Sequence, residues 1–312
     1  MHSLPTASEL VYRVTTIALI KVFRLLPVLV IVSFAFSCKK KAQDNSALFA
    51  EGVSQGKVTR KLEEASGLVS SVTNAGHLWV INDSGNEPEV YLIDDKAEVV
   101  LTCKLEKIKN RDWEDIAIGK APGSDEMFVY VAEVGDNEAK YDFKYLYRFV
   151  EPVMTEDKKI SIEHTQVMVV SLPDGARDME AIAIDHTTGD LYLVSKREEN
   201  VSVYSVPFNQ LIDGDTIVPQ KVVTLPYHNV VAADVSFGGK EILMKTYDEI
   251  LYWNTGDSLN LVQAIQLQAT TLNYSPEPQG ESIAWTLDGS GFYTLSESVD
   301  DEAAKLYYYK RN

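Results

Sequence analysis

Short runs of alternating apolar and polar residues follow one another through most of the chain after residue 55. The stretch RDMEAIAIDHTTGDLYLVSKRE (177–198) contains two such runs, separated by the turn Thr188-Gly189-Asp190. Runs of four to eight residues that are rich in β-branched and aromatic types and bounded by turn residues are typical of β-strands. We find no helical periodicity beyond residue 38, so the pattern predicts an all-β fold without helices.

The same order of strands recurs five times along the chain. The first strand of each unit is expected at 65–71, 113–119, 179–185, 232–238 and 280–286, and alignment on Ser66, Glu114, Glu180, Ala233 and Glu281 gives spacings of 48 to 66 residues. A second strand and a tyrosine-rich third strand follow each time. A fourth strand follows in four units, at 97–105, 165–172, 221–227 and 261–269. Units of about 50 residues with four strands predict a β-propeller, in which each unit is one blade.

The two ends of the repeat region suggest how the ring closes. The fifth unit stops after its third strand, KLYYY (305–309), while GKVTRKLE (56–63) precedes the first unit. We predict that 56–63 is a strand that pairs beside 305–310, because this pairing leaves no sheet edge exposed. Five blades of four strands follow. Six blades are the alternative, since the loop EPVMTEDKKISIEH (151–164) enlarges the second unit.

The N-terminal region has the pattern of a secretory signal. Basic residues precede the apolar run 25–37, and Ala35-Phe36-Ser37-Cys38 resembles the lipobox of bacterial lipoproteins. We therefore predict a signal peptide at 1–37, lipidation of Cys38, a tether at 38–55 and a propeller at 56–312. The body would lie in the periplasm or at the surface of a bacterial cell envelope, anchored to a membrane by lipid. An uncleaved membrane anchor is the alternative.

Charge narrows the range of partners. The formal net charge is −17 and the sequence pI is about 4.7. A surface this acidic repels phosphate backbones, so nucleic acid is not expected as a partner, whereas cations and neutral ligands are favoured. With Cys38 lipidated, Cys103 has no cysteine to pair with and is expected to be an inert buried thiol.

Acidic residues recur where the first strands begin, and these strands line the central channel of a propeller. Glu114, Glu180 and Glu281 are therefore candidate ligands of a metal, with Ca²⁺ or Mg²⁺ as the ions that prefer carboxylate oxygens. Other channel residues are candidates for binding a ligand: Asp83, Glu133, Lys196, Arg197, Asp234, Lys245 and Glu297. The competing interpretation is structural, because a glutamate that recurs in three blades could hydrogen-bond the neighbouring blade. The acidic loops 82–89 and 135–142 could hold Ca²⁺, but neither has the spacing of an EF-hand, so they are expected to be solvated turns.

The blade openings resemble two groups of exported propellers. Ser-Gly-Leu at 66–68 and the later Glu-x-Ile-Ala openings are similar to SdiA-regulated and TolB-like propellers. The stretches 134–149, 177–198 and 280–298 are similar to the esterase-like phytases. The resemblance implies an exported propeller, and lactonase-type and phytase-type propellers imply a central metal ion. The motifs mainly encode blade structure, and a shared propeller does not transfer chemistry.

Three functions are compatible with these observations. The first is a membrane-tethered propeller that binds a ligand or an envelope protein at the acidic end of its channel. The second is a divalent-metal-dependent hydrolase of esters or phosphoesters, with Lys196 or Arg197 holding the anionic group. The third is a structural envelope component. The sequence has no Gly-x-Ser-x-Gly elbow, no Walker loop and no His-Glu-x-x-His motif, which favours binding over catalysis.

Overall fold

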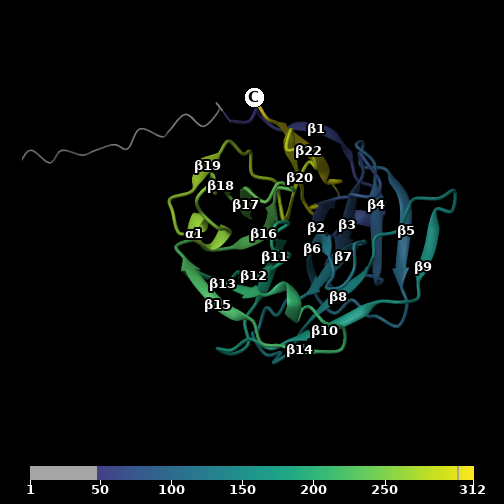
Figure 1. Cartoon of the computed structure of the whole chain (residues 1–312). Helices are drawn as coiled ribbons and strands as arrows, with labels where there is room; N and C mark the ends of the chain where they lie inside the picture. The colour runs from purple at the N-terminus through teal and green to yellow at the C-terminus, as the bar shows by residue number, and fades with distance from the viewer. Residues whose placement is uncertain (1–47, 301) are drawn as a thin grey trace, which may run out of the picture. The chain divides into compact units, whose positions relative to one another are not determined.

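Five antiparallel sheets form a ring around a central axis (Figure 1). This computed structural model describes residues 48–300 and 302–312. The five-bladed propeller predicted from the repeat is confirmed. The predicted signal peptide, Cys38 and most of the predicted tether lie outside the described residues.

The strands of blades 1 to 4 run in chain order from the axis outward, and in blade 5 the first strand of the chain, β1, is outermost. Blade 1 contains β2 (Ala65–Ser70), β3 (Leu78–Asn82), β4 (Glu89–Ile93), β5 (Val99–Leu105) and β9 (Lys159–Ile162). Blade 2 contains β6 (Trp113–Lys120), β7 (Met127–Glu133), β8 (Lys144–Val150), β10 (Gln166–Val170) and β14 (Thr216–Ile217). Blade 3 contains β11 (Met179–Ile184), β12 (Leu191–Ser195), β13 (Val201–Val206) and β15 (Gln220–Leu225).

The last two blades complete the ring. Blade 4 contains β16 (Val230–Val235), β17 (Glu241–Thr246), β18 (Ile250–Asn254) and β19 (Thr270–Leu272). Blade 5 contains β20 (Ser282–Trp285), β21 (Gly291–Leu295), β22 (Lys305–Lys310) and β1 (Val53–Lys57). The innermost strands β2, β6, β11, β16 and β20 pack against their neighbours around the axis. Apolar side chains fill the spaces between adjacent blades, and Cys103 is fully buried there, as expected.

The ring closes as predicted, but the closing strand lies nearer the N-terminus. β1 pairs antiparallel with β22 over Val53–Lys57, not over 56–63, because the chain turns through a short 3-10 helix at Arg60–Leu62 to bury Leu62 before blade 1 begins. Phe49 also belongs to the fold. It is 3% exposed and packs among aromatic side chains of blades 4 and 5. The predicted boundary at residue 56 is therefore too late, and residues 48–55 are not a free tether.

One predicted strand is a helix. The segment expected as the fourth strand of blade 4 begins with α1 (Leu261–Ile265), and β19 follows it at Thr270–Leu272. Leu261, Ala264 and Ile265 are buried at the i, i+3, i+4 spacing of a helix. Asn260 caps the first turn, with the Gln263 backbone N–H donating to its side chain. This local pattern was too short to stand out among the repeated strands.

The enlarged loop of the second unit does not form a sixth blade. Residues 159–162 form β9, which pairs in parallel with β5 and extends blade 1. Thr216–Ile217 extends blade 2 in the same way. Within the described residues, no helix is long and apolar enough to cross a membrane.

Candidate functional site

A β-bulge at the start of the inner strand aims one side chain of several blades into the channel. The pairing of first and second strands skips one residue in blades 1 to 4, and the skipped residues are Ser66, Glu114, Glu180 and Val231. A bulge leaves one residue unpaired and re-aims its side chain. Blade 4 therefore presents Val231 at this position, and the predicted alignment of Ala233 with Glu114 is wrong by two residues.

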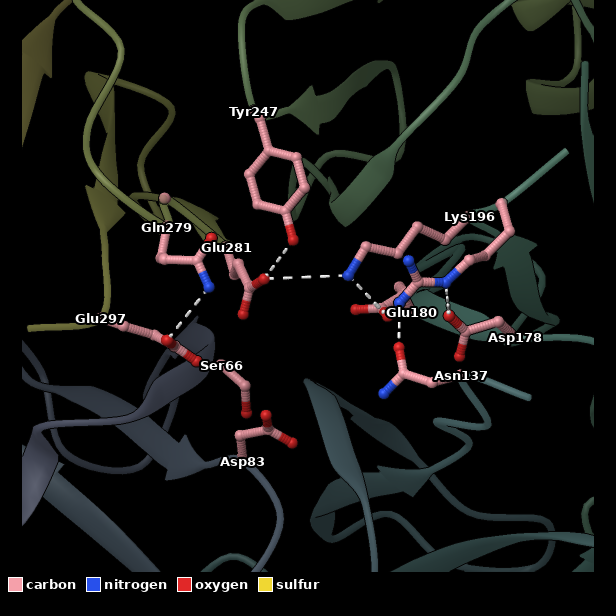
Figure 2. Close-up of polar contacts among 12 residues, drawn as sticks. Ser66, Asp83, Asn137, Asp178, Glu180, Lys196, Tyr247, Gln279, Glu281 and Glu297 are labelled. Carbon is pink, nitrogen blue, oxygen red and sulfur yellow. Dashed lines mark hydrogen bonds and ion pairs between the residues drawn. The ribbon is translucent and has the colours of Figure 1, made fainter. Parts of the chain in front are cut away.

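The bulge glutamates Glu114 and Glu180 belong to a cluster of carboxylates, of which Figure 2 shows Asp83, Asp178 and Glu180. Carboxylate oxygens of Asp83, Asp112 and Glu114 lie within 4.8 Å of one another, and so do those of Glu114, Asp178 and Glu180. Glu114 is shared by both groups. Four of these side chains come from blades 2 and 3, and Asp83 follows the second strand of blade 1.

Two basic side chains neutralise one of the two groups. Lys196 Nζ donates to Glu180 Oε1 at 2.7 Å and lies 3.8 Å from Glu281 Oε1. Arg197 Nε donates to Asp178 Oδ2 at 2.6 Å. No comparable ion pair within 4.0 Å involves Asp83, Asp112 or Glu114 in the described part of the chain. Arg111 and Lys144 lie close enough to favour the charged form of Asp112, but neither forms an ion pair with the first group within 4.0 Å.

Burial makes negative charge costly in this group. Burial raises the pKa of Asp83 to about 6, and the neighbouring Asp112 and Glu281 act in the same direction. Burial, followed by repulsion from Asp178, raises the pKa of Asp112. Burial and the adjacent Glu180 raise the pKa of Glu114 well above its usual range. Carboxyl groups that repel one another in a low-dielectric channel take up protons or bind a cation.

Gly135 allows the carboxyl groups of Asp112 and Glu114 to lie close to its backbone. A Cβ on Gly135 would lie 2.6 Å from Asp112 Cγ and closer still to Glu114 Oε1. The loop after Gly135 is held by Asp136, whose carboxylate accepts hydrogen bonds from the backbone N–H of Lys140 and Tyr141 and from Lys144 Nζ. The acidic loop 135–142 is exposed over 137–140 and at Asp142, as expected of a solvated turn, while the buried Asp136 fixes its backbone.

The donor set suits a hard divalent cation. Ca²⁺ binds oxygen at roughly 2.3–2.6 Å, so oxygens up to about 5 Å apart can share one ion. Asp83, Asp112 and Glu114 meet this condition, and Glu114 and Asp112 can approach the Gly135 backbone because Gly135 has no Cβ. Mg²⁺ demands a stricter octahedral geometry and keeps more of its waters. The spacing of the oxygens is therefore compatible with Ca²⁺.

The three predicted glutamates do not form one ligand set. Glu114 and Glu180 meet, but Glu281 belongs to neither group of converging oxygens. Its Oε1 accepts a hydrogen bond from Tyr247 Oη at 2.5 Å, and the Lys196 ammonium lies between Glu281 and Glu180 (Figure 2). Glu281 is therefore a partner of the basic side chain rather than a third ligand beside Glu114.

Three other predicted channel residues lie away from the cluster. Asp234 accepts hydrogen bonds from the backbone N–H of Val235 and of Trp285 in the next blade, and burial raises its pKa to about 7. The sequence left this kind of inter-blade bridge open for the recurring glutamates, but aspartates make it, since Asp115 also accepts from the Ile182 backbone N–H of the next blade.

Glu133 and Lys245 also lie away from the cluster and contact other residues. Glu133 is buried beside Arg111 and accepts a hydrogen bond from Tyr147 Oη at 3.1 Å. Lys245 is fully buried and donates to the carbonyl of Gly280 between blades 4 and 5. Glu297, by contrast, lies at the edge of the channel, where Gln279 Nε2 donates to it at 3.5 Å (Figure 2).

Several residues of the site were missed from the sequence. Asp112 and Asp178 precede the bulge glutamates by two positions, in the repeated Arg-Asp-x-Glu of blades 2 and 3. That repeat was a visible signal. Tyr247, which follows the second strand of blade 4, and Asn137, which binds Arg197, had no comparable signal because their positions depend on loop conformation.

Comparisons with known proteins find propellers at low similarity. The chain matches no protein-family model and is not significantly similar to any curated protein. A luciferin-regenerating enzyme aligns at 12% identity over 83% of this chain and 94% of that chain, with a TM-score of 0.45. The Dos1 propeller aligns at 12% identity over 78% of this chain and 68% of that chain, with a TM-score of 0.39. The resemblance to the SdiA-regulated, TolB-like and phytase-type groups has no support from these comparisons.

Proposed function

We propose that this propeller is a binding protein that takes up a divalent cation, Ca²⁺ in the first place, at the acidic end of its channel. The observation that carries the proposal is the convergence of Asp83, Asp112 and Glu114 within 4.8 Å, without an ion-pair partner among the described residues. The adjacent group, Asp178 and Glu180, already has Arg197 and Lys196. A divalent cation at the first group would offset most of the negative charge of its three carboxylates.

Binding is better supported than hydrolysis. A hydrolase of esters or phosphoesters would need a group that holds the anionic part of the substrate, and Lys196 and Arg197 are the basic side chains that form ion pairs with the cluster. Both are held by carboxylates at 2.6–2.7 Å. Releasing either one would leave a buried carboxylate unpaired, which costs several kcal/mol as an order of magnitude. Catalysis remains the second hypothesis and becomes an outcome of the experiment.

Calorimetric titration of the mature protein with CaCl₂ tests the proposal. We expect one site per chain, and we expect Glu114→Gln and Asp112→Asn each to weaken it at least tenfold, because each removes a charged ligand. Asp125→Asn is the matched control. Asp125 lies on an exposed turn of the same blade and pairs only with Lys120, so the affinity should not change.

If wild type and Glu114→Gln bind Ca²⁺ with equal affinity, the ion does not bind at the channel site and the proposal is contradicted. Turnover of a generic phosphoester that depends on Ca²⁺ and is lost in Glu114→Gln would replace the binding proposal by the hydrolase.

The proposed location is a bacterial envelope, with the body tethered through lipid on Cys38. The support is the sequence pattern alone, since Cys38 lies outside the described residues. Acyl chains supply the membrane affinity of a lipoprotein. Cys38→Ala should therefore move the protein from the membrane fraction to the soluble fraction or leave it as unprocessed precursor. A wild-type protein that is itself unprocessed and membrane-bound would favour the uncleaved anchor.

A further inference from the structure

One side chain, Asn110, hydrogen-bonds to both blades that supply the first group of carboxylates, Asp83, Asp112 and Glu114. Asn110 lies in the segment between β5 of blade 1 and β6 of blade 2, two residues before Asp112. Its Nδ2 donates to the backbone carbonyl of Asp83 at 2.7 Å and to that of Asn82 at 3.0 Å. Asn110 therefore holds the backbone of blade 1 at the point where Asp83 leaves the second strand.

The same side chain also holds the start of blade 2. Asn110 Oδ1 accepts a hydrogen bond from the Trp113 backbone N–H at 3.2 Å. Trp113 lies between Asp112 and Glu114 in the sequence, so this bond fixes the backbone that carries the two ligands from blade 2. Short polar side chains commonly bond backbone groups a few residues away in this manner. One amide group thus connects the backbone of Asp83 to that of Asp112 and Glu114.

Other contacts of Asp83 stay within blade 1. Its backbone N–H donates to the Glu64 carbonyl at 2.8 Å, and Asn86 Nδ2 donates to the Asp83 carbonyl at 3.1 Å. Glu64 precedes the first strand of blade 1, and Asn86 lies in the loop after its second strand. These two contacts shape the loop around Asp83, whereas the hydrogen bonds of Asn110 fix that loop relative to blade 2.

A calcium site needs such a connection because its ligands repel one another. The oxygens of Asp83, Asp112 and Glu114 lie within 4.8 Å of one another, and ionised carboxylates this close together favour separation. Ligands that are already held together bind an ion more tightly, since less ordering is left to be done when it arrives. A neutral amide suits this task, because it adds hydrogen bonds without adding charge.

We propose that Asn110 is the positioning residue of the calcium site, which holds Asp83 beside Asp112 and Glu114 before the ion binds. The inference rests on the proposed function. Residues that hydrogen-bond behind metal ligands typically change metal affinity about 10- to 100-fold, so we expect Asn110→Ala to weaken Ca²⁺ binding by about that factor. Titration calorimetry with CaCl₂ on the mature protein measures the change.

Replacement by aspartate separates position from charge. Asn110→Asp keeps an acceptor for the Trp113 N–H, but it places a carboxylate oxygen against the carbonyls of Asp83 and Asn82. It also adds a negative charge near the site, which by itself would tighten the binding of a cation. We expect binding about tenfold weaker than in wild type, because the link to blade 1 is lost. Asn200→Asp adds the same charge at an exposed residue of blade 3 and should not weaken binding.

The luminescence lifetime of bound Tb³⁺ in H₂O and D₂O provides a second measurement. The ratio of the two lifetimes counts the water molecules on the ion, and Tb³⁺ binds the same kind of oxygen ligands as Ca²⁺. If Asp83 moves away in Asn110→Ala, water takes its place, and we expect about one more bound water than in wild type. A residue that only stabilises the fold would leave this number unchanged.

The outcomes separate this inference from the proposed function. If wild type binds Ca²⁺ and Asn110→Ala binds it equally tightly, the calcium site stands and the inference is overturned. Weaker binding with an unchanged water count would also overturn it, because Asp83 would then not have moved. If Asn110→Ala does not fold, Asn110→Asp decides by the same two measurements. A wild-type protein that binds no Ca²⁺ would remove the proposed function and this inference together.

Discussion

At the scale of single residues, the identity of the bulge residue decides what each blade offers to the channel. The same backbone irregularity presents Glu114 and Glu180 in blades 2 and 3, Ser66 in blade 1 and Val231 in blade 4. Ser66 is uncharged, and its hydroxyl donates to the Trp113 carbonyl at 2.9 Å. The acidic cluster is therefore concentrated at blades 2 and 3, and one group of its carboxylates forms no ion pair within 4.0 Å among the described residues.

Gly135 provides a test of the space around that group. Gly135→Ala would place a methyl group against Asp112 and Glu114, so we expect calcium affinity to fall at least tenfold and the free energy of unfolding to fall by about 1–3 kcal/mol. Gly238→Ala is the control, because a Cβ there meets no atom within 4 Å. Titration calorimetry and urea unfolding measure the two effects. An alanine at 135 that binds Ca²⁺ normally would show that the two carboxylates are not held where the structure places them.

At the scale of elements, the seam in blade 5 joins the two ends of the described chain. β1 pairs with β22, and Phe49 just before it packs on Trp285 and Phe292, with ring centroids 5.8 and 5.0 Å away. The Arg311 guanidinium lies over the Phe49 ring at 4.8 Å. These contacts show that the N-terminal segment contributes side-chain packing to closure as well as a strand.

Phe49→Ala measures what that packing contributes. Removing a buried phenylalanine ring typically costs about 3–5 kcal/mol, so we expect a loss of that size in urea unfolding. Val53→Ala, in the adjacent strand, should cost less than about 1 kcal/mol because Val53 is 61% exposed. Similar losses for the two variants would mean that the segment before β1 does not stabilise the ring.

The repeat made the blades predictable, but the local exceptions to the repeat could not be predicted from it. Each strand of β-branched and aromatic residues buries a face only against the next blade, so the periodicity alone predicts the architecture. α1 was missed because a capped five-residue helix competes with a strand pattern of the same length. Of the candidate site, Glu114 and Glu180 followed from their repeated position. Sequence spacing does not specify the direction of side chains. It therefore could not predict that Lys196 pairs with Glu180 and Glu281, or that Asp234 and Lys245 lie away from the cluster.

At the scale of the whole molecule, the protein is strongly acidic, with a net charge of −17. Buried carboxyl groups in such a protein make the free energy of unfolding depend on pH. Burial raises the pKa of Asp83 from 3.8 to about 6, so the folded chain holds this proton more tightly than the unfolded chain does. The contribution of Asp83 to stability is thus fully present below about pH 4 and is lost as the pH rises toward 6.

Replacing Asp83 by Asn should remove this dependence. Between pH 4 and pH 6.5, the calcium-free wild type should lose roughly 1–3 kcal/mol relative to Asp83→Asn, measured by urea unfolding in a chelator. Added Ca²⁺ should reverse the trend for wild type, because the ion binds the ionised carboxylates of the folded state. Parallel pH profiles of stability for the two proteins would show that the pKa of Asp83 is not raised in the folded state. Burial would then not destabilise its charge, and a cation would have nothing to compensate there.

Anomalous diffraction from crystals grown with Ca²⁺, and with Tb³⁺ as a stronger scatterer at the same kind of site, tests the central claim most directly. The account predicts one peak at the end of the channel, bounded by carboxylate oxygens of Asp83, Asp112 and Glu114 at roughly 2.3–2.6 Å for Ca²⁺. A channel without a peak at millimolar Ca²⁺, or with Lys196 displaced and the ion between Glu180 and Glu281 instead, would contradict it.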